Sequence, residues 1–149
     1  ARPDQFERVR RDASLIPTTV EEILRWTAPV NQFLRTATCD TEVRGVPIRK
    51  GQAVALFYPS ANRDEDVFSD PDRFLVDRKP NHHLAFGIGE HFCLGAGLAR
   101  MQLRVLLEEL LPRLRHIAPA GEPRPIQTNF IVGFKEVPLE IELAPRGTN

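Results

Sequence analysis

One short loop holds the residues whose types and spacing suggest chemistry. Cys93 lies between Gly89 and Gly95, in a segment that leads directly into a long apolar stretch. Glycine permits positive φ and lets the backbone approach a ligand closely. The unpaired N–H groups and the positive end of the dipole at a helix start favour the thiolate form of a cysteine placed there. Such a thiolate can be a nucleophile, a zinc ligand or a haem ligand.

The surrounding residues weigh against two of these roles. Zinc needs about four ligands, usually with paired cysteines, and the second cysteine, Cys39, is distant and has no CxxC partner. A nucleophile needs a positioned histidine base, and His91, two residues away, is too close along a tight loop to aim at Cys93. The adjacent His82 and His83 lack carboxylate or cysteine ligands at zinc spacing. An axial haem ligand, for which one thiolate suffices, is the best interpretation.

The whole loop resembles the haem-binding loop of the cytochrome P-450 superfamily. It combines a phenylalanine, two glycines, a basic residue and a cysteine in the pattern Phe86-x-x-Gly89-x-His91-x-Cys93-x-Gly95. Residues 93–100, with the sequence CLGAGLAR, look like the bacterial, soluble branch. The resemblance implies that Cys93 is the axial iron ligand of haem b, iron protoporphyrin IX. The structural alternative is a small buried cysteine in a glycine-rich turn.

The resemblance also implies which other residues contact the cofactor. His91 stands where the family has a basic partner of a haem propionate, and Arg35 lies in the strand whose arginine contacts a propionate. Arginine can meet a carboxylate with two parallel hydrogen bonds. Phe86 is expected to shield the thiolate, because a dry environment tunes the iron–sulfur bond. The complete predicted set is Cys93, His91, Arg35, Phe86, Gly87, Gly95 and Ala99.

A helix upstream of the loop carries a second pattern. Pro17 suits a first helical turn, and Thr18 and Glu21 have capping-box spacing, which predicts a helix that runs to about residue 27. Glu22 and Arg25 are three residues apart, so they share one face of this helix. They resemble the Glu-x-x-Arg pair of the superfamily. Most pairs at this spacing are solvated surface pairs worth about 0.3 kcal/mol.

An arginine from a later coil completes a structural triad with this pair in the superfamily. Residues 61–74 are rich in Asp, Asn and Pro and resemble the coil called the meander. Arg78 follows Phe74 with the spacing Phe-x-x-x-Arg, and Arg73 is the alternative. A carboxylate buried between two guanidinium groups would hold the coil in place. The predicted triad is therefore Glu22, Arg25 and Arg78.

The predicted fold class is α+β, the C-terminal part of the mainly helical cytochrome P-450 fold. Its order is the Glu-x-x-Arg helix, a small β-sheet, the meander, the cysteine loop, a long apolar helix and a closing β-hairpin. Apolar residues at helical spacing after Cys93 predict a largely buried helix that weakens near Pro112. The remaining predicted segments are a helix over 4–12, strands over 35–43 and 53–57, and closing strands over 130–134 and 137–143.

Composition fits a soluble protein. The 149 residues include 20 basic and 20 acidic side chains, and this balance gives no reason to expect binding to nucleic acid or to an anionic membrane. No segment approaches the roughly 20 apolar residues of a membrane span. The two cysteines form no disulfide pattern, which favours a cytoplasmic location. We expect one unit over residues 1–149.

The resemblance implies a haem-thiolate monooxygenase that inserts one oxygen atom of O₂ into a small organic substrate, with electrons from a ferredoxin or flavodoxin. The region with the distal helix and its acid–alcohol pair is not in this chain, so no catalytic residue is assigned. The alternative is a truncated haem-binding or interaction module without oxygenase activity. Self-association, or an N-terminal complementing part, is expected. By fold analogy alone, Phe134 and residues around Phe33 border a pocket.

Overall fold

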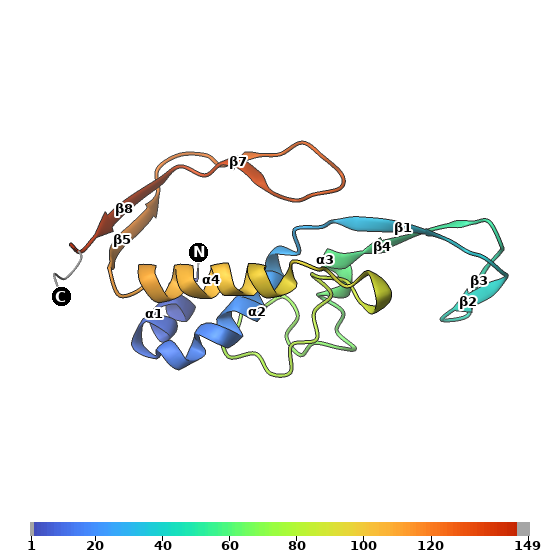
Figure 1. The fold of residues 1–149 in the computed structure, drawn as a ribbon, viewed down its shortest axis with the longest axis horizontal. Coiled ribbons are helices and arrows are strands. Elements are labelled where there is room, and N and C mark those ends of the chain that lie inside the picture. The colour runs from blue at the N-terminus through green and yellow to red at the C-terminus, as the bar shows by residue number, and fades with distance from the viewer. Residues whose placement is uncertain (1, 146–149) are drawn as a thin grey trace.

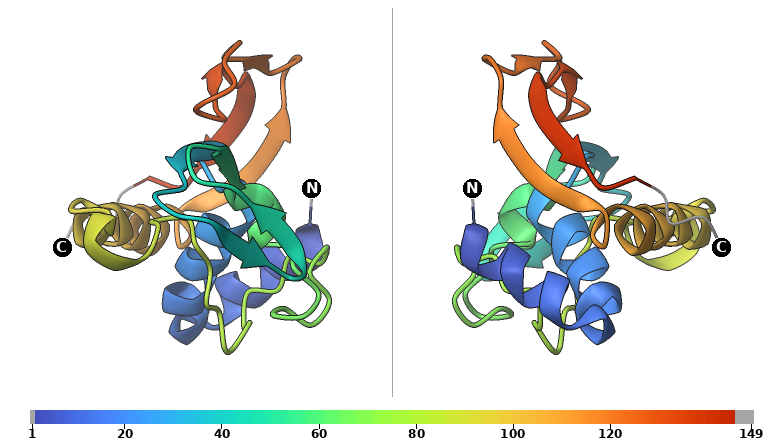
Figure 2. Two further views of the ribbon diagram at one scale, coloured as in Figure 1. Left: turned by 90° about the vertical axis from the view of Figure 1, so that its right-hand side faces the viewer. Right: turned by 90° about the vertical axis from the view of Figure 1, so that its left-hand side faces the viewer.

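The computed structural model describes residues 2–145 and has a small helical body with β-strands extending from both ends (Figures 1 and 2). The helical body contains three main helices: α1 (Pro3–Arg11), α2 (Ile16–Thr27) and α4 (Ala96–Leu110). Shorter turns of helix are η1 (Ala13–Leu15), α3 (Tyr58–Ala61) and η2 (Gly89–His91). Within residues 2–145, no helix has the length and apolar character that crossing a membrane requires.

Helix α2 begins earlier than its sequence signals predict. The predicted capping box is wrong, because η1 runs directly into α2 and Thr18 therefore lies inside the helix. Its hydroxyl instead shares its single proton between the carbonyl oxygens of Leu15, at 3.0 Å, and Val76, at 2.6 Å. The predicted end is confirmed: Thr27 is the last helical residue, and Ala28 follows in the left-handed region at φ 36°.

The strands after α2 form two antiparallel pairs. Strand β1 (Gln32–Thr36) pairs with β4 (Ala53–Phe57), and β2 (Thr41–Val43) pairs with β3 (Val46–Ile48). The strand predicted over 35–43 is thus two strands. Asp40 breaks it, because its side chain accepts a hydrogen bond from the Lys50 amide, at 2.7 Å, and so stabilises a turn. The strand predicted over 53–57 coincides with β4.

The coil between α3 and η2 is attached to the helices at several points. Residues 62–88 form turns and irregular backbone, as the meander resemblance predicts. The Val76 amide donates to the Gln5 side chain of α1 at 3.1 Å, while the Val76 carbonyl accepts from Thr18 of α2. These hydrogen bonds satisfy buried backbone groups that a long coil would otherwise leave unpaired.

The hydrophobic core lies where α1, α2, this coil and the end of α4 meet. It is built from aliphatic residues of all four segments: Val9, Ile16, Val20, Leu24, Val76, Ala85 and Leu111. Leu103 and Leu107 of α4 pack against this core from one side. The same contacts fix the direction of α4, and with it the loop that precedes the helix.

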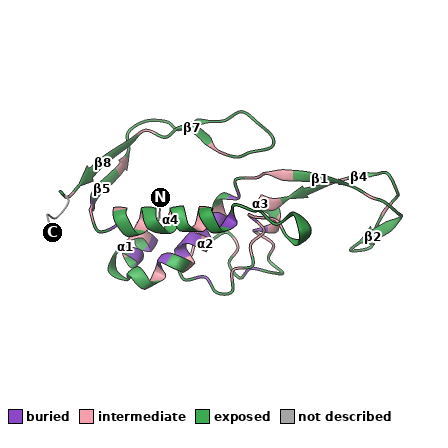
Figure 3. Cartoon of the chain, viewed as in Figure 1, coloured by how far each residue is buried: buried purple, intermediate pink, exposed green. Residues whose placement is uncertain are grey.

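The prediction that α4 is largely buried is wrong for this chain. Ala96 is the single fully buried residue of the helix among those described. The outer side is exposed, including Leu98 (55%), Met101 (49%), Val105 (45%) and Leu106 (55%), as Figure 3 shows in green along α4. The periodic sequence specifies an apolar surface, but within residues 2–145 only one side of α4 is covered.

We expect this exposed surface to cause self-association. Apolar patches beyond a few hundred Å² usually mark contact sites or aggregation. Light scattering at low micromolar concentration should show species larger than a monomer, with binding of a hydrophobic dye. The double variant Leu98→Gln/Leu106→Gln should reduce both signals, whereas Glu109→Gln on the same helix should change neither. A monodisperse wild-type monomer that binds no dye would contradict the prediction.

The closing β structure consists of two two-stranded sheets. Strand β5 (Leu114–Pro119) pairs with β8 (Leu139–Leu143), and β6 (Arg124–Pro125) pairs with β7 (Phe134–Glu136). The two segments expected to close the fold therefore pair with earlier strands and not with each other. Residues 130–134 contribute only an isolated bridge from Ile131 to Val30 and the start of β7. The alternating β8 is exposed throughout, not half-buried.

Candidate functional site

A pocket of about 700 Å³ brings together most of the predicted cofactor residues. Its wall is mainly apolar and contains Pro29, Val30, Phe33, Arg35, Tyr58, Ala85, Phe86, Gly87, Ile88, His91 and Cys93. Five of the seven predicted residues are present: Cys93, His91, Arg35, Phe86 and Gly87. Gly95 and Ala99 are not part of this wall, and neither is Phe134, whereas Phe33 is.

The cysteine loop is shaped by its glycines and by one hydrogen bond. Gly87 and Gly89 both have positive φ, 73° and 75°. The Cys93 amide donates to the carbonyl oxygen of Phe86 at 2.9 Å, which closes the loop. Gly95 is the N-cap residue of α4, and a Cβ there would lie 3.8 Å from the Cys93 sulfur. Cys93 is therefore an exposed residue of the pocket wall, just before the start of α4.

Two basic side chains face the same pocket from different elements. Arg35 comes from β1, and His91 comes from η2. Arg35 donates to its neighbour's carbonyl oxygen, Leu34 O, at 3.0 Å and lies 5.7 Å from the Phe33 ring centre. Neither Arg35 nor His91 is in an ion pair among residues 2–145. The pocket thus offers a thiol and two basic groups that are available to an anionic ligand.

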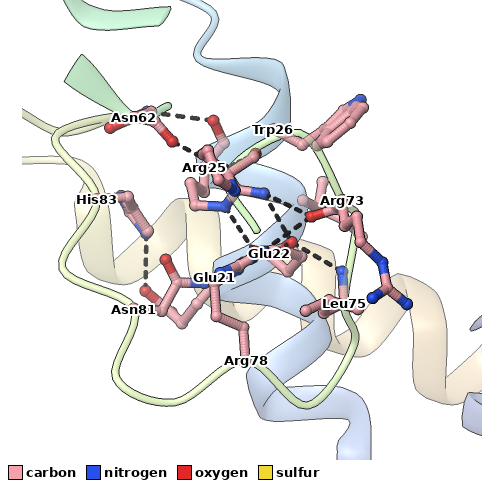
Figure 4. Close-up of polar contacts among 12 residues, drawn as sticks. Glu21, Glu22, Arg25, Trp26, Asn62, Arg73, Leu75, Arg78, Asn81 and His83 are labelled. Atoms are coloured by element: carbon pink, nitrogen blue, oxygen red, sulfur yellow. Dashed lines mark hydrogen bonds and ion pairs between the residues drawn. The ribbon is translucent and has the colours of Figure 1, made fainter. Parts of the chain in front are cut away.

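In the predicted triad, both Arg25 and Arg78 contact Glu22 (Figure 4). Arg25 donates to both carboxylate oxygens of Glu22, from Nε at 2.7 Å and from Nη2 at 2.9 Å. Arg78 Nε donates to Glu22 Oε2 at 3.1 Å. The side chains of Glu22 and Arg25 are 0% exposed, and that of Arg78 is 4% exposed. Two cations and one buried anion form a compact network.

The remaining donors of the two arginines bind the coil. Arg25 donates to the carbonyl oxygens of Asn62, Pro71 and Arg73, at 2.7, 2.9 and 3.0 Å. Arg78 donates to two more coil carbonyls, those of Ser69 and Asp70, and shares the Arg73 carbonyl with Arg25. Arg73 therefore joins through its backbone, while its own side chain is 63% exposed beside Asp70. The geometry favours Arg78 over Arg73 as the third residue.

The network keeps Glu22 ionised. Burial alone would raise the pKa of this carboxyl group. Hydrogen bonds from Arg25 and from the Leu75 amide, together with the charges of Arg25 and Arg78, outweigh that effect and hold the pKa below its ordinary value. The Leu75 amide donates to Glu22 Oε1 at 2.8 Å, and Asn81 Nδ2 donates to Oε2 at 3.2 Å.

Sequence reasoning missed Asn62, which is completely buried. Its Nδ2 donates to the Arg25 carbonyl oxygen at 3.2 Å, and its Oδ1 accepts from the Leu84 amide at 2.7 Å. Asn62 thus connects the end of α2 to the segment that enters the cysteine loop. A second missed group consists of Glu21, His83 and Arg100, in which both His83 and Arg100 contact the Glu21 carboxylate. The one sequence signal for this group was that Glu21 is a second acidic residue directly beside Glu22.

Comparison with known proteins identifies the family. The family model described as Cytochrome P450 matches residues 8–143. The chain is 51% identical over 142 residues to Cytochrome P450-terp of a Pseudomonas species, and this match covers 95% of the chain and 33% of that protein. It is 46% identical to a Steroid C26-monooxygenase of Mycolicibacterium smegmatis, with 91% of the chain and 34% of that protein covered.

A solved structure supports the same assignment. Cytochrome P450-153 from Novosphingobium aromaticivorans has a TM-score of 0.89 and 49% identity to this chain, and the match covers 94% of the chain and 36% of that structure. The chain belongs to the cytochrome P450 family, and its fold is that of the C-terminal part of these proteins. It spans about a third of the length of the relatives it matches.

Proposed function

We propose that this chain forms the haem-holding portion of a monooxygenase and that Cys93 is the axial ligand of haem b. The observation that carries the proposal is the shared pocket of Cys93, Arg35 and His91. The residues present fit the cofactor chemically. A haem is a flat apolar macrocycle with two carboxylates, and this pocket has apolar walls, a thiol and two basic groups without acidic partners among residues 2–145.

Each residue has a separate task in this proposal. Cys93 supplies the sulfur, and the short loop hydrogen bond to Phe86 O fixes where that sulfur lies. Phe86, in the wall of the same pocket, limits access of water to the sulfur. Arg35 and His91 neutralise the propionates and set the orientation of the ring. When bound, a haem with thiolate ligation supplies the activation of O₂, in which one oxygen atom enters a C–H bond and the other becomes water.

The activity of a complete monooxygenase also requires an electron donor and a substrate. The proposal includes a ferredoxin- or flavodoxin-type donor and a small organic substrate. The family assignment supports both at the level of class. The steroid named for one relative is that protein's substrate, while the apolar pocket wall of this chain supports an apolar compound as its own.

The proposal is tested by titrating the purified chain with haem and then reducing it under carbon monoxide. A red-shifted Soret band, typical of thiolate ligation, is expected at saturation. Haem binding without that band would refute Cys93 ligation. A thiolate band without substrate oxidation, even with an electron donor supplied, would instead identify a haem-binding module without oxygenase activity.

Removing both basic groups should weaken haem retention. We expect the variant Arg35→Ala/His91→Ala to bind haem at least about tenfold more weakly, because a hydrogen bond to a charged group contributes about 1.5–3 kcal/mol. The thiolate band should persist, since Cys93 is unchanged. Haem transfer to apomyoglobin measures the affinity. Arg49→Ala, which removes an exposed arginine outside the pocket, is the control. Equal affinity of the double variant and wild type would exclude propionate contacts.

A further inference from the structure

Three side chains from separate segments meet next to Phe86, at the start of the cysteine loop. Arg100 of α4 donates to both carboxylate oxygens of Glu21 of α2, from Nε at 2.7 Å and from Nη2 at 2.9 Å. His83 Nε2 lies 3.0 Å from Glu21 Oε2. These residues are 62 and 79 positions from Glu21 along the chain. We call Glu21, His83 and Arg100 the Glu21 cluster.

The burial of His83 and its hydrogen bonds to Glu21 and the Ala85 amide determine its protonation state. Its side chain is 3% exposed, and burial lowers the pKa of the imidazole despite the opposing effect of Glu21. His83 is therefore neutral at pH 7. Its Nδ1 accepts a hydrogen bond from the Ala85 amide at 3.2 Å, so Nε2 carries the proton. His83 thus donates to Glu21 and at the same time holds the backbone of Ala85.

The Glu21 cluster also contacts Phe86, the first residue of the cysteine loop. The guanidinium carbon of Arg100 lies 4.8 Å from the centre of the Phe86 ring, within the range of a cation–π contact. The His83 ring centre is 6.1 Å from the same ring. Because Glu21 binds Arg100 through two parallel hydrogen bonds, the plane of the guanidinium is fixed over the ring.

Phe86 in turn holds the cysteine. The Cys93 amide donates to its carbonyl oxygen at 2.9 Å, and the Gly87 amide donates to Leu84 O at 2.9 Å in the segment that enters the loop. The Glu21 cluster therefore holds residues 85–86 through two contacts. His83 accepts a hydrogen bond from the Ala85 amide, and Arg100 lies over the Phe86 ring. A partly exposed ion pair contributes little to global stability, so the consequence of this arrangement is local.

We infer that Glu21, His83 and Arg100 are positioning residues that hold Phe86 and, through its carbonyl oxygen, the amide of Cys93. The cluster holds the ligand loop from α2 and α4 through side chains that do not belong to the buried Glu22 triad. This inference rests on the proposed function for its importance to haem. The hydrogen bonds of the Glu21 cluster and of the Cys93 amide form without the cofactor.

Amide hydrogen exchange of the chain without haem tests the positional claim directly. In Arg100→Met, which keeps an apolar side chain, we expect the Ala85 and Cys93 amides to exchange about tenfold faster or more, since hydrogen bonds to charged groups are lost and the loop opens locally. The Ala28 amide, which donates to Leu24 O at the end of α2, should keep its rate. His83→Leu should have the same effect as Arg100→Met.

Two further variants separate positioning from general destabilisation. His83→Gln keeps a donor near the position of Nε2 and should restore part of the protection that His83→Leu loses. Arg104→Met removes an exposed arginine one turn along α4 that pairs with Glu108 at 3.6 Å, and it should leave Cys93 exchange unchanged. Unchanged exchange at Cys93 in Arg100→Met, or equal acceleration at Cys93 and Ala28, would overturn the inference.

The haem-loaded protein gives an independent readout. Under carbon monoxide, Arg100→Met and His83→Leu should lose the red-shifted Soret band faster on standing than wild type, because the loop no longer holds the thiolate in place. Absence of the band in wild type would refute Cys93 ligation and leave the exchange result to decide the positional claim. A wild-type band that Arg100→Met retains equally long would contradict the inference.

Discussion

Cys93→Ser is expected to abolish the red-shifted Soret band of the haem-loaded, reduced protein under carbon monoxide. Serine has nearly the shape of cysteine and can keep the amide hydrogen bond to Phe86 O, so the loop should fold as before. Its hydroxyl ionises far less readily than a thiol, and the electron density that a thiolate supplies to the iron is lost. The loss should be complete, which makes this one of the two largest effects expected of any single change in the chain.

Cys39→Ser is the matched control. Cys39 is exposed in the turn between β1 and β2, and it is absent from the wall of the pocket. Its replacement should leave both the band and the haem affinity unchanged. A normal thiolate band in Cys93→Ser would contradict the ligand assignment, and loss of the band in Cys39→Ser would transfer that assignment to the second cysteine.

The ligand loop could be predicted from sequence because its constraints are local. Positive φ at Gly87 and Gly89 and the hydrogen bond from Cys93 to Phe86 O all fall within one short segment. The spacing of residue types therefore carries almost all the information. The same holds for Glu22 and Arg25, which share a helix face three residues apart.

Contacts between distant segments could not be predicted in the same way. Asn62 contacts Arg25 from 37 residues away, and Arg100 contacts Glu21 from 79 residues away. Asn, His and Arg are common surface residues, and no local pattern marks them as partners. The exposed side of α4 has another cause. Helical periodicity predicts which side is apolar, but it says nothing about whether another segment covers it.

Breaking the buried Glu22 triad should cause a large loss of folding stability. Arg25→Met or Glu22→Gln is expected to lower the free energy of unfolding by roughly 3–5 kcal/mol. Glu22→Gln leaves two buried arginines without their carboxylate, and Arg25→Met leaves the buried Glu22 with Arg78 as its remaining cation. Urea denaturation at pH 7 measures the loss. The double variant should lose clearly less than the sum of the two single losses, since both residues belong to one network.

The exposed pair Glu7 and Arg10 provides the control within the same chain. It has the same three-residue spacing and a 3.0 Å ion pair, but its side chains are 45% and 37% exposed. Glu7→Gln should therefore change the free energy of unfolding by less than about 0.5 kcal/mol. Losses of that size in Glu22→Gln and Arg25→Met, adding fully in the double variant, would show that the buried network does not stabilise the coil.

Acid should remove the stabilisation that ionised Glu22 gives the wild-type protein. The pKa of Glu22 is lowered in the folded state, so the unfolded chain binds this proton more readily as pH falls. The stabilisation is fully present above the pKa of the unfolded carboxyl group, about 4.3, and is lost as pH drops through the lower folded value. Glu22→Gln has no proton to bind at this site. Its free energy of unfolding should therefore fall less steeply than that of wild type across this range, and parallel curves would place the acid sensitivity in other carboxyl groups.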